Sequence, residues 1–363
     1  MKNTEKRAKI PIFAKVCACI LIFSIAVHIA SALSAAFADF FNLRIAVIFR
    51  RGLAYITNIL PFSMAEMLIY LLPVIIFVVV LYCVHIDGDK VKGVRLICTL
   101  LAVISLFYSS FVLAFGTGYH TKRLNERLGY SDGQISTADL QGTAKWLSDE
   151  LYAITPLIEY GEDGASVMPY SFSELNGKLL SAYERAEQKY PFIDSFYSRT
   201  KEVMSGEYMS HLRTLGVYTY FTGEANVNTT PPDYDTPYTM AHEMAHQRGI
   251  AREDEANFVA FLVCIEAEDA YIRYSGYLNV FEYVSGALYE TDPEAYMQIS
   301  YPAGVYYDRL AYREYYYKYS DTAIGDVSNK INDAYLKAQG TEGRISYDLV
   351  TTLAVGYFKS TAR

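Results

Sequence analysis

Apolar residues are concentrated in three long runs near the beginning of the chain. The runs cover residues 16–38, 67–86 and 96–119, and each is uncharged and long enough to cross a bilayer as a helix. We therefore predict three transmembrane helices within a membrane domain of residues 1–119. A cleaved signal peptide fits less well, because the first run is long and two more follow it. Residues 45–64 are predicted to form an interfacial or re-entrant helix on the membrane.

Basic residues flank these runs unevenly. Five precede the first run, and three more occupy the short loop between the second and third runs: Lys2, Lys6, Arg7, Lys9 and Lys15, then Lys90, Lys92 and Arg95. Because loops rich in Lys and Arg stay in the cytoplasm, we predict a cytoplasmic N-terminus and an extracytoplasmic chain after about His120. Arg44, Arg50 and Arg51, in the loop predicted to lie outside, argue weakly against this orientation.

Beyond the third run the pattern becomes that of a mainly helical domain. Apolar residues recur at helical spacing in residues 139–154 and 173–189, whereas residues 216–228 are rich in β-branched and aromatic residues between glycines and predict one or two short strands. We predict a mainly α protein: three N-terminal transmembrane helices, then an extracytoplasmic, predominantly helical α+β domain of residues 120–363 with a small β-sheet. The strand segment fits a substrate-binding edge strand and an ordinary supporting hairpin about equally.

One short helix carries the residues with the clearest chemistry. His242 and His246 are four residues apart, so a helix places both imidazoles on one face, with Glu243 beside the first. Such a pair can hold Zn²⁺ while the carboxylate accepts a proton from a bound water. Thr236 is a suitable residue to cap the start of this helix, and Gly249 can supply a left-handed stop.

A catalytic zinc site needs a third protein ligand. Glu253 begins the next predicted helix, and a turn at Gly249 would swing that helix back toward the histidines. Glu255 lies about 200° further around the same helix, so only one of the two can face the metal. We favour Glu253 and keep Glu255 as the alternative. Asn257, one turn beyond Glu253, could hydrogen-bond a ligating histidine.

These residues also resemble known families. His242-Glu-x-x-His246 followed by Glu253-x-x-Ala256-Asn257 resembles the gluzincin metallopeptidases, although the link between the two parts is short and closer to the metzincin spacing. The resemblance implies a zincin-like domain with zinc on His242, His246 and Glu253 and with Glu243 as general base. The three spans together with His-Glu-Met-Ala-His-Gln-Arg-Gly and Glu-Asp-Glu-Ala-Asn-Phe also resemble the bacterial membrane family DUF3810, which implies an architecture but no substrate.

Charge and cysteine content exclude several function classes. The first 118 residues carry a net charge of +6 and the remainder −14, and the acidic part shows no basic patch suited to nucleic acid. Four of the five cysteines lie in or beside the apolar runs, which leaves Cys264 alone in the remainder and provides no disulfide framework there. The expected partners are the lipid bilayer and a peptide or protein substrate; the oligomeric state is left open.

The leading hypothesis is a membrane-anchored zinc metallopeptidase. His211, Tyr218, Tyr220 and Arg248 are all conceivable donors to the oxyanion that forms during amide hydrolysis. Two alternatives remain: a non-catalytic receptor or assembly factor that keeps a zincin fold, and a hydrolase of cell-wall amides with the same chemistry. An intramembrane protease is disfavoured, because the motif lies more than a hundred residues after the last predicted span.

Overall fold

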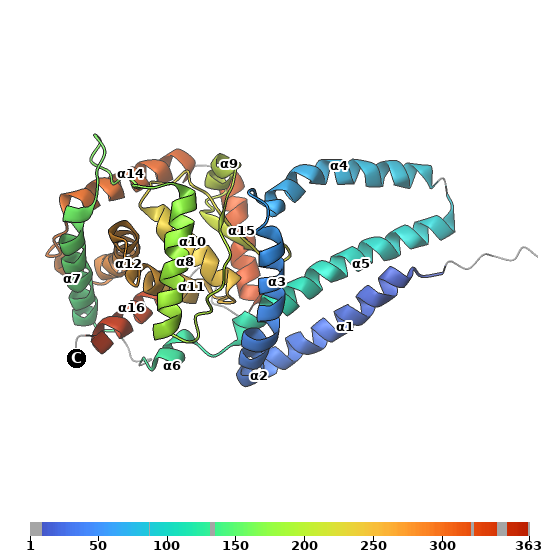
Figure 1. The fold of residues 1–363 in the computed structure, drawn as a ribbon, viewed down its shortest axis with the longest axis horizontal. Coiled ribbons are helices and arrows are strands. Elements are labelled where there is room, and N and C mark those ends of the chain that lie inside the picture. Colours follow the sequence, from blue (N-terminus) through green and yellow to red (C-terminus); the bar gives the residue numbers. More distant parts are fainter. Residues whose placement is uncertain (1–8, 87, 131–134, 321–322, 340–346, 362–363) are drawn as a thin grey trace, which may run out of the picture.

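The computed structural model describes residues 9–86, 88–130, 135–320, 323–339 and 347–361. A helical body carries three long helices that project from one side of it (Figure 1). The mainly helical fold with a small β-sheet predicted above is confirmed. Lys2, Lys6 and Arg7, which entered the orientation argument, lie outside the described residues.

The projecting helices are α1 (Ile12–Leu33), α4 (Met64–His85) and α5 (Lys90–Ala114), each long and apolar enough to cross a membrane. The three predicted apolar helices are thus confirmed, with boundaries up to six residues earlier than expected. The starts are earlier because backbone hydrogen bonding continues into polar flanks that a hydropathy pattern omits; α5, for example, begins at Lys90 with Asp89 capping it. The ends of α1 and α5 are earlier because other helical segments begin there, at Ala35 and at Gly116. Helix α1 packs along α5, whereas α4 diverges from α5 toward the body (Figure 1).

A short helical segment joins the spans to the body. It consists of α2 (Ala35–Phe40), a π-helical turn η1 (Phe41–Ala46) and α3 (Val47–Thr57), and α3 stands at the junction in Figure 1. One face of α3 is buried and includes Arg50 and Ala54, while Ile48 and Ile56 are exposed. This amphipathic helix covers the middle of residues 45–64, for which an interfacial or re-entrant helix stays a prediction.

The body is built from the remaining helices around one large core. Two short 3₁₀ turns, η2 (Gly116–His120) and η3 (Thr155–Leu157), accompany them. The α-helices are α6 (Leu124–Leu128), α7 (Thr137–Ile154), α8 (Phe172–Lys189), α9 (Gly206–His211), α10 (Asp235–Gln247), α11 (Glu253–Ile265), α12 (Ala270–Thr291), α13 (Pro293–Tyr296), α14 (Ala303–Ser320), α15 (Ala323–Ala338) and α16 (Tyr347–Thr361). Helix α10 packs against α11, and both contact α12.

A small mixed sheet completes the body. Strand β3 (Glu224–Val227) is central, with β1 (Lys201–Glu202) parallel to it on one side and β2 (Gly216–Thr219) antiparallel on the other. The segment predicted to contain one or two strands therefore forms the hairpin β2–β3. Strand β2 lies at the edge of the sheet and also contacts α10, so the sheet edge is beside the histidine-bearing helix.

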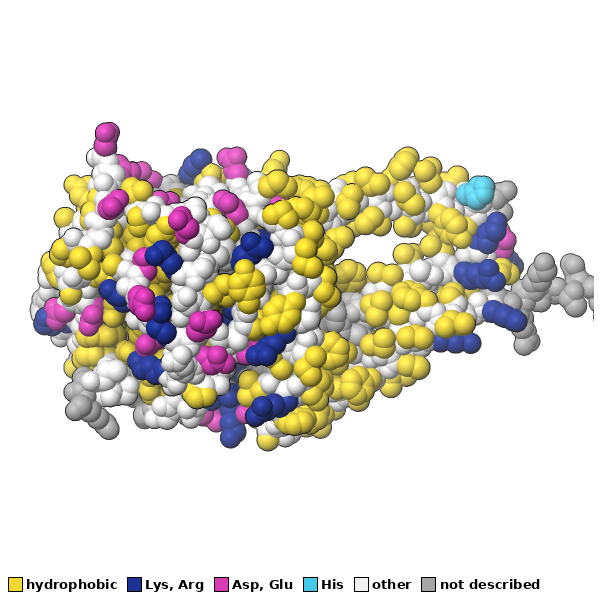
Figure 2. Space-filling view, in the orientation of Figure 1, with side chains coloured by type: hydrophobic (Ala, Val, Ile, Leu, Met, Phe, Trp, Pro, Cys, Tyr) yellow, Lys and Arg dark blue, Asp and Glu magenta, His cyan; other side chains and the backbone are white. Residues whose placement is uncertain are grey.

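The surface changes character between the two parts. Hydrophobic side chains cover the projecting helices almost completely, whereas charged side chains are scattered over the body (Figure 2). Lys and Arg side chains also gather at the far ends of the projecting helices in that view. This distribution is that of a membrane protein with a water-exposed body.

Candidate metal centre

Helices α10 and α11 form a two-helix unit around a tight turn. Helix α10 begins at Asp235, one residue before Thr236, so Thr236 is not the capping residue that we predicted; Tyr234 occupies that position and makes no side-chain cap. The helix stops as expected at Gly249, whose φ of 92° lies in the left-handed region that favours glycine. The Gly249 N–H donates to the carbonyl of His246 at 2.9 Å, and α11 then starts four residues later.

The turn brings the three predicted ligands together. The Nε2 atom of His242 lies 3.3 Å from one carboxylate oxygen of Glu253, and the Nε2 atom of His246 lies 3.5 Å from the other. One ligand atom from each of the three residues falls within 4.8 Å of the other two, so the group could hold a metal ion. Two nitrogens and one carboxylate are a donor set that suits zinc.

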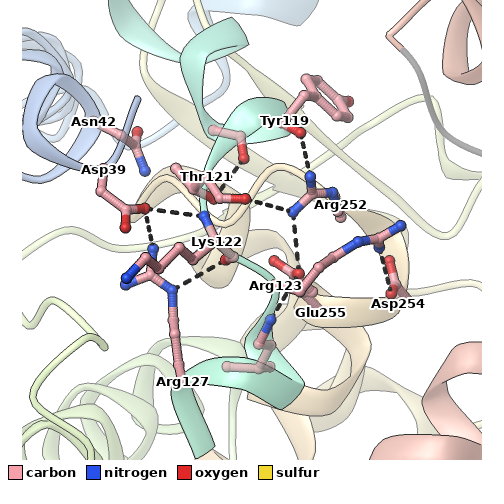
Figure 3. A network of polar contacts seen from close by, with 12 residues as sticks. Asp39, Asn42, Tyr119, Thr121, Lys122, Arg123, Arg127, Arg252, Asp254 and Glu255 are labelled. Carbon is pink, nitrogen blue, oxygen red and sulfur yellow. Dashed lines mark hydrogen bonds and ion pairs between the residues drawn. The ribbon is translucent and has the colours of Figure 1, made fainter. Parts of the chain in front are cut away.

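Glu255 points elsewhere. Its carboxylate accepts a hydrogen bond from the Leu124 backbone N–H at 3.0 Å and pairs with Arg252 at 3.3 Å. Figure 3 shows this carboxylate within a polar network that joins the start of α11 to residues 119–127 and to Asp39 of α2. The neighbouring Asp254 pairs there with Arg123 at 3.5 Å. The geometry therefore favours Glu253 over Glu255 as the third ligand.

One histidine is oriented from behind by the backbone. The Nδ1 atom of His246 lies 2.7 Å from the carbonyl oxygen of Ile250, so this nitrogen donates and leaves Nε2 facing Glu253. The Nδ1 atom of His242 is buried and has no partner within the described residues. The hydrogen bond that we predicted from Asn257 to a ligating histidine is wrong, because the turn after Gly249 places the Ile250 carbonyl against His246.

Charge and burial shift the pKa values of the group in opposite directions. Burial acts to raise the pKa of Glu253, yet the two imidazoles hold that pKa well below its usual range. Burial acts to lower the pKa of His246, and the Glu253 carboxylate overrides it and raises that pKa to about 9. Each member therefore stabilises the charged form of the other.

The side chain of Glu243 is buried and lies against Gly216 of β2. A Cβ atom added to Gly216 would lie 2.5 Å from the Cγ and Oε1 atoms of Glu243, so only glycine fits there. Burial raises the pKa of Glu243 to about 7, against the opposing charges of His242 and His246 and the Tyr218 backbone N–H. Its Oε2 atom is buried and has no hydrogen-bond partner within the described residues.

The register of the hairpin shows which groups of β2 are free. The Asn228 N–H donates to the Leu215 carbonyl at 2.8 Å, and Val217 is opposite Asn226. In an antiparallel pair, main-chain groups alternate between the partner and the open side. Gly216 and Tyr218 therefore direct their backbone N–H and C=O groups away from β3, on the side where Glu243 lies. The Tyr218 N–H donates to the Glu243 carboxylate, and the remaining main-chain groups of this edge could pair with an extended polypeptide.

The conceivable oxyanion donors are held in different surroundings. Arg248 is buried, with its guanidinium over the rings of Tyr183 (4.1 Å) and Phe196 (4.7 Å), and it donates to the Phe196 carbonyl. These contacts direct the Arg248 side chain into the body, so it is not available as an oxyanion donor. The Tyr218 ring packs on Phe115, 5.2 Å between centroids, and the other two rings pack elsewhere: Tyr220 on Phe111 and His211 on Tyr319.

Two tyrosines that sequence reasoning did not single out lie near the metal ligands. The hydroxyl groups of Tyr119 and Tyr335 are 3.2 Å apart. Burial, with a contribution from the Glu253 charge, raises the pKa of Tyr335 to about 12. Helix α15 supplies Tyr335 from far along the chain, and no signal distinguishes this residue among the 34 tyrosines of the sequence.

Residues of the membrane junction hold the far end of α10. The guanidinium of Arg50 donates to the Arg248 carbonyl at 3.4 Å and to the Ala114 carbonyl at 2.9 Å, and Asn42 donates to the Gly249 carbonyl at 3.0 Å. Burial lowers the pKa of Arg50 to about 10, which leaves it charged at neutral pH. A buried cation thus caps the C-terminal end of the metal-site helix.

Comparison with known proteins gives a family. Neither the curated proteins nor the solved structures contain a match to this chain. A family model described as a protein of unknown function, DUF3810, matches residues 42–355. The match begins inside the junction segment and extends through the metal centre to α16, and the chain therefore belongs to the DUF3810 family.

Proposed function

We propose that this protein is a membrane-anchored, zinc-dependent peptidase with a zincin-like body. The observation that supports the proposal most strongly is the convergence of His242, His246 and Glu253, with Glu243 buried beside them and a free strand edge above. A zinc peptidase needs these three components together: a ligand set, a base and a place for an extended substrate.

The residues present fit a zinc ion. The two Nε2 atoms and the Glu253 carboxylate face one another, and the Ile250 carbonyl holds the tautomer of His246 that presents Nε2. When bound, zinc would supply a Lewis acid that polarises the scissile carbonyl and lowers the pKa of a water molecule. Among the described residues, this group contains three protein ligands and no fourth. A coordination position is therefore left for water or substrate.

Glu243 is the proposed general base. Burial brings its pKa to about 7, near the value at which a carboxylate can both accept and return a proton at neutral pH. In amide hydrolysis Glu243 would take the proton of the attacking water and pass it to the leaving amine. Gly216 makes room for this carboxylate, because any larger residue there would displace it.

The free edge of β2 is the proposed substrate platform. The backbone N–H and C=O of Gly216 and the C=O of Tyr218 could form ladder hydrogen bonds with an extended chain, which would orient a peptide bond across the proposed metal ligands. Such a platform recognises backbone rather than one side chain. A folded globular substrate would have to expose an extended segment to use it.

The state of Glu243 favours catalysis over a purely binding role. A buried carboxylate with an unpaired oxygen costs stability, and a metal site that only holds the fold together has no use for it. A receptor or assembly factor would work as well with an apolar residue at this position. Hydrolysis of a cell-wall amide shares the chemistry and is separated from proteolysis by substrate profiling.

We also propose that the body lies outside the cytoplasm. Two of the three arginines that argued against this orientation have structural roles: Arg50 is buried as a helix cap, and Arg51 pairs with Asp194. Basic residues bound within the protein give a weaker orientation signal than exposed ones, whereas Lys90 and Lys92 at the other end are exposed. Accessibility of the body to protease in intact cells tests this, and protection of the body would contradict it.

Metal analysis of the purified full-length protein is the first test of the function. We expect about one zinc per chain and loss of that zinc in His246→Ala. Glu253→Gln should raise the zinc dissociation constant on the order of a hundredfold or more, and the matched control Glu255→Gln should leave it unchanged. Equal effects of the two glutamate substitutions would overturn the assignment of the third ligand.

Glu243→Gln separates chemistry from metal binding. We expect hydrolysis of an unfolded polypeptide such as casein to fall by about a thousandfold, with zinc content unchanged. If the zinc-loaded protein cleaves neither casein nor cell-wall peptides, or if Glu243→Gln has no effect on cleavage, the peptidase proposal is wrong.

A further inference from the structure

The metal centre lies directly against the segments that enter the membrane. Phe115, the first residue after α5, packs edge-on against the ring of His246, with 5.8 Å between centroids. The Phe115 ring also contacts the ring of Tyr218 on β2. A proposed zinc ligand and the substrate platform therefore both touch the residue at which the third span ends.

The turn of the β2–β3 hairpin reaches further toward the bilayer. Tyr220 packs on Phe111 and Phe221 on Phe107, with centroids 5.3 Å and 5.1 Å apart. Phe107 lies about 10 Å along α5 from the end of that helix, at 1.5 Å per residue. Since Arg95 marks the opposite end of the apolar stretch, a hydrocarbon core of about 30 Å extends nearly to Ala114. The aromatic side chains of the hairpin turn thus reach past the membrane interface to the edge of the hydrocarbon core.

Two further contacts fix the sheet at this level. A Cβ atom added to Gly223 in the hairpin turn would lie 2.7 Å from the Leu53 Cβ of α3, the amphipathic helix whose other face exposes Ile48 and Ile56. The carboxylate of Glu224, on β3, accepts hydrogen bonds from the backbone N–H groups of Met64 and Ala65 at the start of α4. The hairpin is therefore attached to α3, α4 and α5 at once.

The free edge of β2 runs from the metal centre to this membrane-facing turn. Gly216 is beside Glu243, and Phe221 is five residues further along, a distance of at most about 17 Å in an extended strand. A polypeptide paired with β2 would follow the same line. One of its ends would reach the bilayer surface within about five residues of the bond held at the metal ligands.

From this geometry we infer that the substrate is a polypeptide anchored in the same bilayer, cut within about ten residues of the membrane surface. The inference rests on the proposed peptidase function and names its substrate class. A juxtamembrane segment fits the site because it is extended, already at the right depth and confined beside β2. A freely diffusing protein gains nothing from a platform set at this depth.

The first experiment measures the depth of β2 and needs no catalysis. A bimane fluorophore is placed on Val217→Cys, an exposed β2 position, in a full-length protein whose accessible cysteines Cys19, Cys83 and Cys98 are Ala. The matched control is Tyr306→Cys on α14, which lies away from the spans (Figure 1). In phosphatidylcholine vesicles with spin-labelled headgroups we expect at least roughly a twofold greater loss of fluorescence at position 217. Equal loss at both positions would overturn the inference, whether or not the protein cleaves anything.

The second experiment measures the position of cleavage. A sequence that the protein cuts in free casein is placed about 5, 20 or 40 residues from a lipid anchor in an otherwise unfolded polypeptide, and the same polypeptides are prepared without the lipid. In vesicles we expect the anchored 5-residue substrate to be cut on the order of tenfold or more faster than the anchored 40-residue substrate and than any free one.

The outcomes of this experiment distinguish a failure of the proposed substrate class from a failure of the proposed peptidase function. Similar rates at all three spacings, with free substrate cut as fast as anchored substrate, would overturn the membrane-proximal substrate and leave the peptidase intact. Cleavage of none of the polypeptides by zinc-loaded protein would remove the peptidase function itself, and the substrate class with it. Glu243→Gln in the same vesicles shows that any cleavage comes from this site.

Discussion

The two ends of helix α10 belong to different parts of the molecule. At its C-terminal end, Arg50 and Asn42 of the junction donate to the carbonyls of Arg248 and Gly249, the two residues that follow the helix. At its N-terminal end, the contacts come from the body: the Tyr238 N–H donates to Ser275, and the buried Asp235 accepts from Thr239. The candidate metal ligands lie between these ends. The candidate centre is therefore at the joint between the membrane segments and the body, and contacts from both parts hold it.

Removing the membrane-side cap should have the largest effect. Arg50→Met leaves four backbone and side-chain acceptors without their buried cation, and we expect a loss of about 4 kcal/mol in the free energy of unfolding together with weaker zinc binding. Denaturant unfolding in mixed micelles measures this. Arg51→Met, whose partly exposed side chain pairs with Asp194, is the matched control and should cost less than about 1 kcal/mol. Equal costs would mean that the junction does not support α10.

At the N-terminal end of α10, the contribution of Asp235 to the free energy of unfolding should depend on pH. Burial, opposed by the hydrogen bonds of Thr239 and Asn279, raises the pKa of Asp235 from 3.8 to about 6 in the folded protein. The folded state therefore holds this proton more tightly, so stability from Asp235 is present below about pH 4 and is lost as the pH rises to about 6. The loss is about 3 kcal/mol.

The variant Asp235→Asn cannot ionise at this position, so its free energy of unfolding should not fall between about pH 4 and pH 6 through this group. In zinc-free protein, wild type and variant should have similar free energies of unfolding near pH 4, and the variant should be the more stable near pH 7. The difference between them removes the contribution of other titrating groups. A difference that does not change between these pH values would contradict the burial argument.

A change beside Glu243, in the middle of α10, should lower the rate of hydrolysis without changing zinc binding. Gly216→Ala places a methyl group against the Glu243 carboxylate, and displacement of a base by about 1 Å can lower the rate about a hundredfold. Zinc content should stay at the wild-type value. Gly177→Ala on α8, where a Cβ meets nothing, is the control and should be neutral. Full activity in Gly216→Ala would remove Glu243 from the proposed role.

The smallest effect is expected at the contact between span and ligand. Phe115→Leu keeps an apolar side chain but removes the edge-on contact with His246 and the tilted ring contact with Tyr218, together worth about 1 kcal/mol in unfolding free energy. Zinc affinity should fall less than in Glu253→Gln. A loss of zinc as complete as in His246→Ala would show that Phe115 orients the ligand rather than only packing on it.

Sequence reasoning predicted the parts of this molecule that local patterns specify. The spans follow from apolar runs, and α10, its stop at Gly249 and the start of α11 follow from spacing and glycine chemistry. Helix geometry also indicates that only one of Glu253 and Glu255 can face the histidines, because residues two apart face different sides. The structure places Glu253 there. One or two short strands were predicted at residues 216–228 because the segment is rich in β-branched and aromatic residues and is bounded by glycine.

The remaining features depend on contacts between distant residues. Nothing near Arg50 in the sequence indicates that it caps a helix 198 residues away, and a basic residue in a loop was instead read as a topology signal. Arg248 was a plausible oxyanion donor by position, yet its guanidinium is enclosed by Tyr183 and Phe196. Tyr335 reaches Tyr119 through the packing of α15, which no periodicity reveals. Such pairings require the three-dimensional structure.

The cap at Arg50 also imposes an order on how the protein is made. At about 5–20 residues per second, the ribosome needs on the order of ten to forty seconds after adding Arg50 to reach Arg248. During that interval the second and third spans are synthesised, and the arginine is held by Asn42 and Ala114 without the Arg248 carbonyl that it will bind. The last step in forming the metal-site helix is therefore the docking of newly made chain onto a membrane surface that is already in place.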